Sequence, residues 1–403
     1  MKRSERKIQS ATNWQFILGL LCVVFLVASG ILLAEKINDS VKIKAKPTKT
    51  SIVQKKKTSS SPNGVQTARI MANGDLLYHD LLYMSALQSD GTYDFTENYQ
   101  YVKPWLKKAD LVLGDFEGTI RPNYPLAGYP LFNAPESVVS AIKDAGYQVV
   151  DLAHNHILDS QLEGVFSTAK AFEQQGITPI GVYTHKNRDK ASLVIKKVNG
   201  IKIALLAYSY GFNGLEENIS HADYNHHLSD LNEEKMKKEI KQAEKEADIT
   251  VVMPQMGVEY QLEPTQEQKT LYHKMIEWGA DIIFGGHPHV VEPSEVIKQN
   301  GQKKFIIYSM GNFISNQRIE TMDGVENKKW TERGVLMDVT VEKSKKGTII
   351  KDVQAHPSWV SRVPKGTYSP EGYPLYTYQT YILEDFIEGG KYRNQLDQAT
   401  KER

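Results

Sequence analysis

The chain from Arg69 onward alternates short apolar runs with longer amphipathic stretches. Short apolar runs bounded by glycine or polar residues are typical of buried strands, whereas apolar positions three or four apart predict helices. The runs predict strands at Arg69–Ala72, Leu111–Leu113, Gln148–Leu152, Thr178–Val182, Ile249–Met253, Asp281–Phe284 and Phe305–Tyr308. The amphipathic stretches predict helices near Tyr99–Lys108, Pro135–Ala145, Leu162–Gln175, Ser229–Glu246 and Pro264–Trp278. This alternation predicts an α/β fold.

Two antiparallel pairs interrupt the alternation. Ser192–Val198 and Ile201–Tyr208 are separated by Asn199-Gly200, a dipeptide suited to the type I′ turn of a hairpin. A second pair is predicted at Val335–Val341 and Thr348–Val353. The chain is therefore expected to contain mixed sheets with an antiparallel C-terminal part.

The N-terminal region contains an apolar segment of a different kind. Phe16–Ala34 has no charge over 19 residues, which at ~1.5 Å per residue nearly crosses a ~30 Å hydrocarbon layer. We expect an uncleaved, single-pass signal anchor at residues 16–34 after a short cytoplasmic segment, residues 1–15. The alternative is a signal peptide cleaved near Ala28-Ser29-Gly30. Because long domains after a first span translocate largely regardless of charge, we expect the rest of the chain outside the cell membrane.

The net charge of +1 conceals two oppositely charged parts. Residues 1–68 hold 12 Lys+Arg against 3 Asp+Glu, a net of +9, and residues 69–403 hold 37 against 45, a net of −8. The Lys-, Ser- and Thr-rich segment 35–68 predicts a solvated linker, either a plain spacer or a contact for anionic lipid or acidic wall polymer. The acidic remainder argues against nucleic acid as a partner. A single cysteine, Cys22, excludes an intramolecular disulfide framework.

Polar clusters follow four of the predicted strands. In α/β sheets, functional groups gather beyond the carboxyl ends of strands. One such cluster alone is explained as a turn, but four together favour a shared site. Oxygen and nitrogen ligands without thiolate suit one or two Mn, Fe or Zn ions. The clusters are Asn73-Gly74-Asp75, Gly114-Asp115-Phe116-Glu117, Ala153-His154-Asn155-His156 with Asp159, and Gly285-Gly286-His287-Pro288-His289.

An ordered set of longer motifs runs from about Arg69 to Ser315. The set comprises Gly74-Asp75, Phe116-Glu117, Phe132-Asn133-Ala134-Pro135, Leu152 to Asp159, Gly257-Val258-Glu259-Tyr260, Gly279-Ala280-Asp281, Gly286 to Val290 and Tyr308 to Phe313. It resembles the CapA family of poly-γ-glutamate capsule proteins, which is related to calcineurin-like metallophosphatases. The resemblance implies a four-layer α/β/β/α sandwich over residues 69–320, with the site at a sheet edge. Residues 321–403 would form a C-terminal β extension and tail.

The resemblance also implies roles for individual residues. Glu117, with Asp115, would bridge two ions. Asn155 and His287 would complete one ion's ligands, and Asp75 and His289 those of the other. His156 would donate a proton to the leaving group, and Asp159 would orient it, as carboxylates often do for imidazoles.

Two positions depart from the implied pattern. Gln255-Met256 stands where the family usually has His-Trp, so Gln255 would be a weaker ligand than imidazole. Leu77 stands where metallophosphatases have a second histidine after the first aspartate. Both departures leave open a degenerate site that only binds polymer.

The resemblance implies a membrane-anchored protein that serves the biosynthesis or export of an anionic surface polymer, poly-γ-glutamate or a capsule-like material. Its partners would be the membrane, the polymer and subunits of a polymer synthase or exporter. The mechanism would be metal-dependent hydrolysis. A non-enzymatic accessory subunit and a surface phosphoesterase unrelated to capsule are the alternatives.

Overall fold

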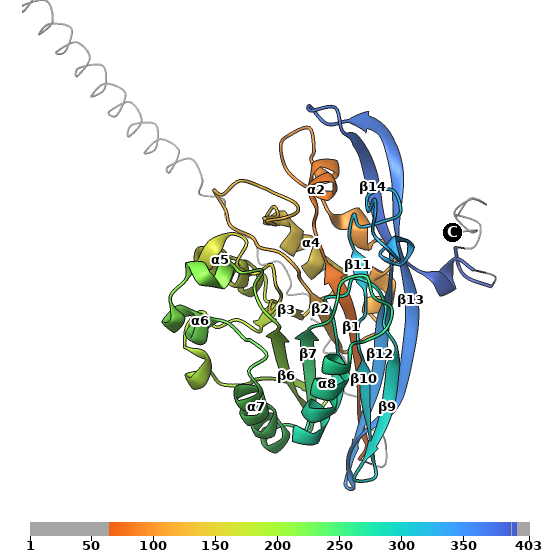
Figure 1. Cartoon of the computed structure of the whole chain (residues 1–403). Coiled ribbons are helices and arrows are strands. Elements are labelled where there is room, and N and C mark those ends of the chain that lie inside the picture. Colours follow the sequence, from red (N-terminus) through yellow and green to blue (C-terminus); the bar gives the residue numbers. More distant parts are fainter. Residues whose placement is uncertain (1–63, 388, 393–403) are drawn as a thin grey trace, which may run out of the picture. The chain divides into compact units, whose positions relative to one another are not determined.

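Two mixed β-sheets form the centre of the fold in the computed structural model, which describes residues 64–387 and 389–392 (Figure 1). The first sheet has the order β14-β13-β12-β1-β2-β3-β4, and β11 pairs with β1; the second has the order β5-β6-β7-β8-β10-β9. The strands of the first sheet are β14 (Pro374–Ile382), β13 (Gly347–Tyr368), β12 (Arg333–Ser344), β1 (Gln66–Leu76), β2 (Leu111–Asp115), β3 (Val149–Asp151), β4 (Thr178–Ile180) and β11 (Asn312–Ile314). Those of the second are β5 (Val194–Val198), β6 (Ile201–Ser209), β7 (Ile249–Gln255), β8 (Ile282–Phe284), β10 (Gln302–Ile307) and β9 (Ser294–Gln299).

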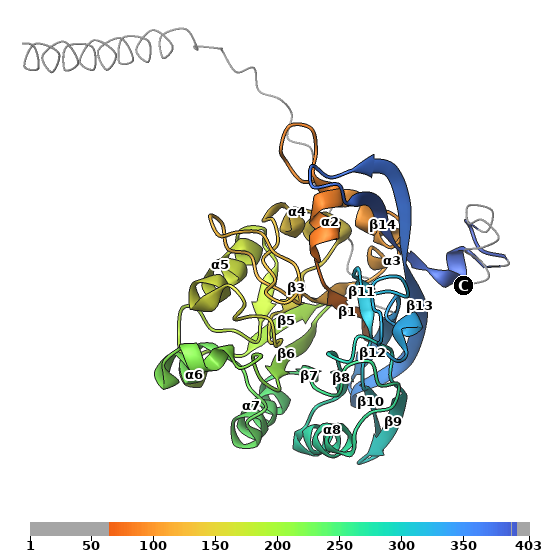
Figure 2. The same cartoon turned by 45° about the horizontal axis from the view of Figure 1, so that its top comes forward.

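Helices cover the outer face of each sheet, as Figures 1 and 2 show. The α-helices are α2 (Asp80–Ala86), α3 (Lys103–Leu106), α4 (Ser137–Ala145), α5 (Gln161–Gln174), α6 (His221–His227), α7 (Glu233–Glu246) and α8 (Gln266–Trp278). Short 3₁₀ turns are η1 (Thr96–Tyr99), η2 (Arg188–Lys190), η3 (Leu215–Asn218), η4 (Lys328–Trp330) and η5 (Leu383–Asp385).

Three buried apolar clusters define the layers. One lies between the first sheet and helices that include α4 and α5, and another packs α7 and α8 on the second sheet. The third joins the facing sides of the two sheets and contains Ile70, Leu113, Ile203 and Val251. Alternate residues of each strand face opposite sides, so one strand supplies two clusters. The layers therefore follow the order helix, sheet, sheet, helix.

Parallel pairing brings acidic strand ends side by side. β1, β2, β3 and β4 run parallel, and their register places Asp75 beside Asp115 and Asp115 beside Asp151. The register shifts between Ala72 and Asp75, which marks an irregularity just before the first carboxylate. Three carboxylates thus meet at one edge of the first sheet.

The predicted elements are confirmed in kind, with changes at their ends, except for the helix predicted near Tyr99–Lys108. The strand predicted at Arg69–Ala72 runs from Gln66 to Leu76, so Asp75 lies within β1 and not beyond it. The added length comes from antiparallel pairing with β12, which extends from Gln66 to Asn73, and from parallel pairing of Asp75 and Leu76 with β11. Both predicted hairpins are present, as β5–β6 and β12–β13. The segment predicted near Tyr99–Lys108 forms only η1 and the single turn α3.

The C-terminal strands belong to the first sheet. β12 pairs directly with β1, and β13 and β14 continue the sheet outward. Val335, Met337 and Val339 of β12 lie in the core between the sheets. Residues beyond 320 therefore contribute to the sheet that carries the acidic strand ends.

Within residues 64–387 and 389–392, no helix combines the length and apolar character that crossing a membrane requires. The predicted N-terminal segment 1–15, the predicted anchor 16–34 and most of the predicted linker 35–68 lie outside the described residues.

Candidate functional site

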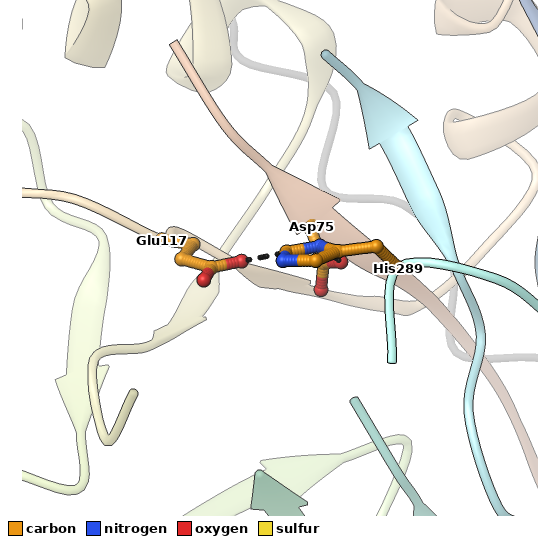
Figure 3. Close-up of side chains that lie close together, drawn as sticks. All are labelled: Asp75, Glu117 and His289. Carbon is orange, nitrogen blue, oxygen red and sulfur yellow. Dashed lines mark hydrogen bonds and ion pairs between the residues drawn. The ribbon is translucent and has the colours of Figure 1, made fainter. Parts of the chain in front are cut away.

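Asp75, Glu117 and His289 converge at the edge of the first sheet (Figure 3). Asp75 comes from β1, Glu117 follows β2, and His289 follows β8 of the second sheet. The Asp75 Oδ2 and His289 Nδ1 atoms are 2.8 Å apart, and Glu117 Oε2 lies 3.8 Å from the same nitrogen. All three side chains are buried, and one ligand atom from each lies within 4.8 Å of the others. This spacing is small enough for the three atoms to share one metal ion.

His156 and Asp159 form a second buried pair next to this cluster. His156 Nδ1 lies 2.7 Å from Asp159 Oδ2, and His156 Nε2 lies 3.9 Å from Glu117 Oε1. The same Asp159 oxygen accepts a hydrogen bond from the Phe132 backbone N–H at 2.6 Å, and the Phe132 ring packs edge-on against His156. Asp159 therefore holds the imidazole with Nε2 directed toward Glu117.

Gln255 joins the two sheets at the site. It is the last residue of β7, and its side-chain amide donates a short hydrogen bond to the Asp115 carboxylate at the end of β2. Next to it, Gly286 comes so close that an added Cβ would lie 3.0 Å from Asp115 Oδ2 and 3.1 Å from Gln255 Nε2. The position predicted as the weak ligand thus borders the acidic strand ends.

Asn155 and His287 contribute from opposite sheets. Asn155 is buried and donates its side-chain N–H to Asn213 Oδ1 at 3.2 Å. His287 is buried too, and its ring lies 4.6 Å from the half-exposed ring of Tyr210, measured between centroids. The His287 and His289 rings are 6.2 Å apart. The structure therefore places all nine predicted residues in one connected region.

The backbone of the His287-Pro288-His289 loop is strained. His287 has φ +95° and His289 has φ +59°, values that residues with a Cβ seldom adopt. Residues held in such conformations cluster at functional sites, where the surrounding structure compensates their cost of ~1–3 kcal/mol each. This loop places the His289 ring against Asp75 and Glu117 and the His287 ring beside Tyr210.

Burial shifts the acidic groups toward their neutral forms. Burial raises the pKa of Glu117 to about 7, with Asp75 adding to the rise and His289 and His156 opposing it. The pKa of Asp115 is raised well above its usual range by burial, then by Asp151, Asp75 and Glu117. A cation among these groups would relieve their mutual repulsion.

The pKa values of the His287 and His156 imidazoles are shifted in opposite directions. Burial, followed by repulsion from His289 and His156, lowers the pKa of His287 to about 3, which keeps its ring neutral as a metal ligand must be. Burial also lowers the pKa of His156, but the Asp159 hydrogen bond and the Glu117 charge outweigh it and raise the pKa overall. This shift favours the protonated form of His156, the form that a general acid needs.

Unpartnered buried atoms test whether a metal would fit. Buried polar atoms are almost always hydrogen-bonded, so each exception calls for an explanation such as an ion. Six of the seven predicted ligands have at least one buried atom without a hydrogen-bond partner. These atoms are Asp75 Oδ1, Asp115 Oδ1, both Glu117 oxygens, Asn155 Oδ1, Gln255 Oε1 and His287 Nδ1. Carboxylate, amide and imidazole groups are the donor set of Mn, Fe or Zn. The residues present therefore fit a divalent metal.

Sequence reasoning missed several residues of the site. Asp151 interrupts an apolar run at the end of β3, and a charge in a buried strand was a usable signal. Tyr260 stacks near His289 at 6.0 Å between ring centroids, and Tyr210 and Asn213 follow β6. The motif that ends in Tyr260 was a usable signal for that residue, but no local pattern distinguishes Asn213 from an ordinary turn residue, because its contact with Asn155 joins the two sheets.

The chain is 34% identical over 228 residues to "Capsule biosynthesis protein CapA" of Bacillus anthracis, covering 54% of each chain. It is also 34% identical over 228 residues to "PGA biosynthesis protein CapA" of Bacillus subtilis strain 168, covering 54% of this chain and 57% of that one. The matched region thus spans about half the length of these relatives.

A solved structure of lower similarity is the calcineurin-like phosphoesterase YfkN from Bacillus subtilis. It has a TM-score of 0.40 and 14% identity, and the match covers 73% of this chain and 90% of that one. At this similarity nothing about the activity of this chain follows. The profile of the bacterial capsule synthesis protein family PGA_cap matches residues 69–317, well over half of the chain. The chain therefore belongs to the PGA_cap family of bacterial capsule synthesis proteins.

Proposed function

We propose that this protein serves the biosynthesis or export of an anionic, capsule-like polymer through a metal-dependent hydrolase site. The polymer is a γ-glutamyl chain, in keeping with the resemblance of the motifs. The observation that carries the proposal is the set of buried atoms without a hydrogen-bond partner on six of the predicted ligands. A fold that buries so many unsatisfied acceptors loses stability unless a ligand compensates them.

The residues divide between holding metal and moving a proton. Asp75, Glu117 and His289 would hold one divalent ion, while the remaining predicted ligands surround the neighbouring position. A bound ion of this kind supplies Lewis-acid polarisation of the bond to be cleaved. His156, fixed by Asp159, presents Nε2 beside Glu117 and donates its proton to the leaving group.

The loop of residues 122–133 next to His156 is rigid and has no charged side chain, so it can support an extended substrate. The Phe132 ring links His156 to Tyr129, which is 78% exposed, and Leu131 is 47% exposed. The Asn133 side chain ties this loop together by donating to three backbone carbonyls, those of Arg121, Tyr124 and Pro125. Exposed apolar groups held beside a site provide a surface for a bound ligand. A polymer chain can rest its methylene groups on this surface while one unit enters the site.

One observation favours a second candidate, a non-enzymatic accessory subunit. The Gln255 amide donates to Asp115, so one carboxylate oxygen of the implied metal position is already occupied by protein. An amide in place of an imidazole weakens transition-metal binding. In this alternative the site binds polymer without cleaving it.

Metal binding and turnover of the purified full-length chain test the proposal. We expect the wild-type chain to bind Mn²⁺ or Zn²⁺ and to cleave γ-glutamyl polymer only when loaded. Gln255→His should tighten binding by on the order of tenfold or more, by analogy with the ~10–100-fold effect of altering groups around a metal. Titration calorimetry measures the metal affinity, and the change in polymer length measures cleavage. If the wild-type chain binds no divalent metal, the hydrolase proposal is wrong. If the metal affinity of Gln255→His equals that of the wild type, Gln255 is not a metal ligand.

Attachment to the cell membrane is part of the proposal. It rests on the uncharged stretch Phe16–Ala34 and the long hydrophilic region that follows. Protease added to intact protoplasts should digest residues 69–403, as detected with an antibody against that region. Lysed protoplasts serve as the control. Protection in intact cells together with digestion after lysis would place this region inside the cell.

A further inference from the structure

Asn213 contacts two residues of the site from outside the predicted set. It lies in the turn after β6 of the second sheet, whereas Asn155 and His156 follow β3 of the first sheet. Its Oδ1 accepts a hydrogen bond from Asn155 Nδ2 at 3.2 Å, and its Nδ2 lies 3.4 Å from His156 Nδ1. Nδ1 of His156 already lies 2.7 Å from Asp159 and is therefore occupied. The bond to Asn155 is consequently the stronger of the two contacts that Asn213 makes with these residues.

The polarity of the Asn155 amide depends on this bond. An asparagine can present either its oxygen or its NH₂ group in a given direction. With Nδ2 donating to Asn213, Oδ1 faces the opposite way, where it is buried and has no hydrogen-bond partner. Reversal of the amide would direct N–H groups at a cation and lose the bond to Asn213.

The turn that carries Asn213 is held firmly. The Tyr210 backbone N–H donates to the Gln255 carbonyl at 3.1 Å, and Phe212 is buried against the helix-covered side of the first sheet. The Tyr210 hydroxyl donates to Asn213 Oδ1 at 3.4 Å. Asn213 therefore has a defined position although it is exposed, and the turn is attached to both sheets.

We infer that Asn213 is a positioning residue that fixes the Asn155 side-chain oxygen toward a bound metal. The inference rests on the proposed function, because it assumes that Asn155 is a ligand. Groups that orient metal ligands typically change metal affinity by ~10–100-fold when removed. Asn213 thus couples the second sheet to a ligand carried by the first.

Three variants of the full-length chain separate this role from a role in the turn. Asn213 has φ +56°, so Asn213→Gly keeps the backbone conformation and removes only the side chain. Asn213→Asp keeps an acceptor for Asn155. Asn300→Gly is the matched control, since Asn300 has φ +49° in the β9–β10 turn on the far edge of the second sheet.

Mn²⁺ titration calorimetry gives the deciding measurement, with thermal unfolding in chelator as the check on folding. We expect Asn213→Gly to weaken Mn²⁺ binding by about 10–100-fold, with a melting temperature in chelator no lower than that of Asn300→Gly. Asn213→Asp should keep an affinity close to wild type. If Asn213→Gly binds Mn²⁺ with wild-type affinity, the inference is wrong but the proposed function stands. The same holds if Asn213→Asp binds Mn²⁺ as weakly as Asn213→Gly. Absence of divalent metal from the wild-type chain instead overturns the proposed function and, with it, this inference.

Discussion

Replacing His156 by alanine is expected to leave bound metal in place and to lower polymer cleavage by the ~10²–10⁴-fold typical of a general acid. The His156 ring lies 3.9 Å from Glu117 through Nε2 and is held by Asp159 through Nδ1, so it is a neighbour of the ligand cluster and not a member of it. Metal content and turnover should be measured on the same purified full-length chain, and polymer yield in cells that carry the variant.

His287→Ala provides the contrast to His156→Ala. His287 is buried, neutral and has an unpartnered Nδ1, so its removal should lower metal content and activity together. Normal polymer yield from a metal-replete His156→Ala protein would exclude catalysis and leave the accessory role. Loss of metal from His156→Ala would show that this imidazole is a ligand.

Glu117→Gln is expected to stabilise the metal-free protein at pH 8 and to abolish its stabilisation by metal. Burial raises the pKa of Glu117 from 4.5 to about 7, so between these values the folded chain binds more protons than the unfolded chain. Stability contributed by this group is therefore present below pH 4.5 and lost as pH rises through about 7. The loss is on the order of 3 kcal/mol at about 1.4 kcal/mol per pKa unit. Glutamine imitates the protonated side chain and does not titrate.

Urea unfolding in chelator at pH 5 and pH 8 measures this effect. Wild type and Glu117→Gln should differ little at pH 5, and the variant should be more stable at pH 8. Metal at ~1,000 times its Kd should reverse the order, because it stabilises the folded wild-type chain by ~4.1 kcal/mol, more than the variant gains. A wild-type chain that is as stable as the variant at pH 8 without metal would show that Glu117 is not under the inferred electrostatic strain.

Much of the site could be predicted because most of its functional residues lie in short sequence motifs. Gly-Asp, Asn-His and His-Pro-His segments follow apolar runs, and such runs report buried strands through local periodicity. The carboxyl ends of parallel strands meet at one edge, so residues after these runs were expected to lie together. Asp75, Glu117 and His289 do converge.

Other contacts could not be predicted because they depend on pairing between distant segments. Gln255 and Asp115 are 140 residues apart, and their hydrogen bond exists only because the two sheets face each other at the site. Asn213 belongs to an ordinary Asn-Gly turn by sequence, and its contact with Asn155 spans the two sheets.

The amino-acid sequence by itself determined the kind and order of most elements and the residue types that carry the chemistry, because periodicity and turn residues act over a few neighbouring positions. Only the tertiary structure decided where β1 ends, since its last residues, Asp75 and Leu76, pair with β11. It also decided which side-chain atoms are left without partners. Those outcomes depend on burial and on the register between strands, and both arise from contacts that no local pattern encodes.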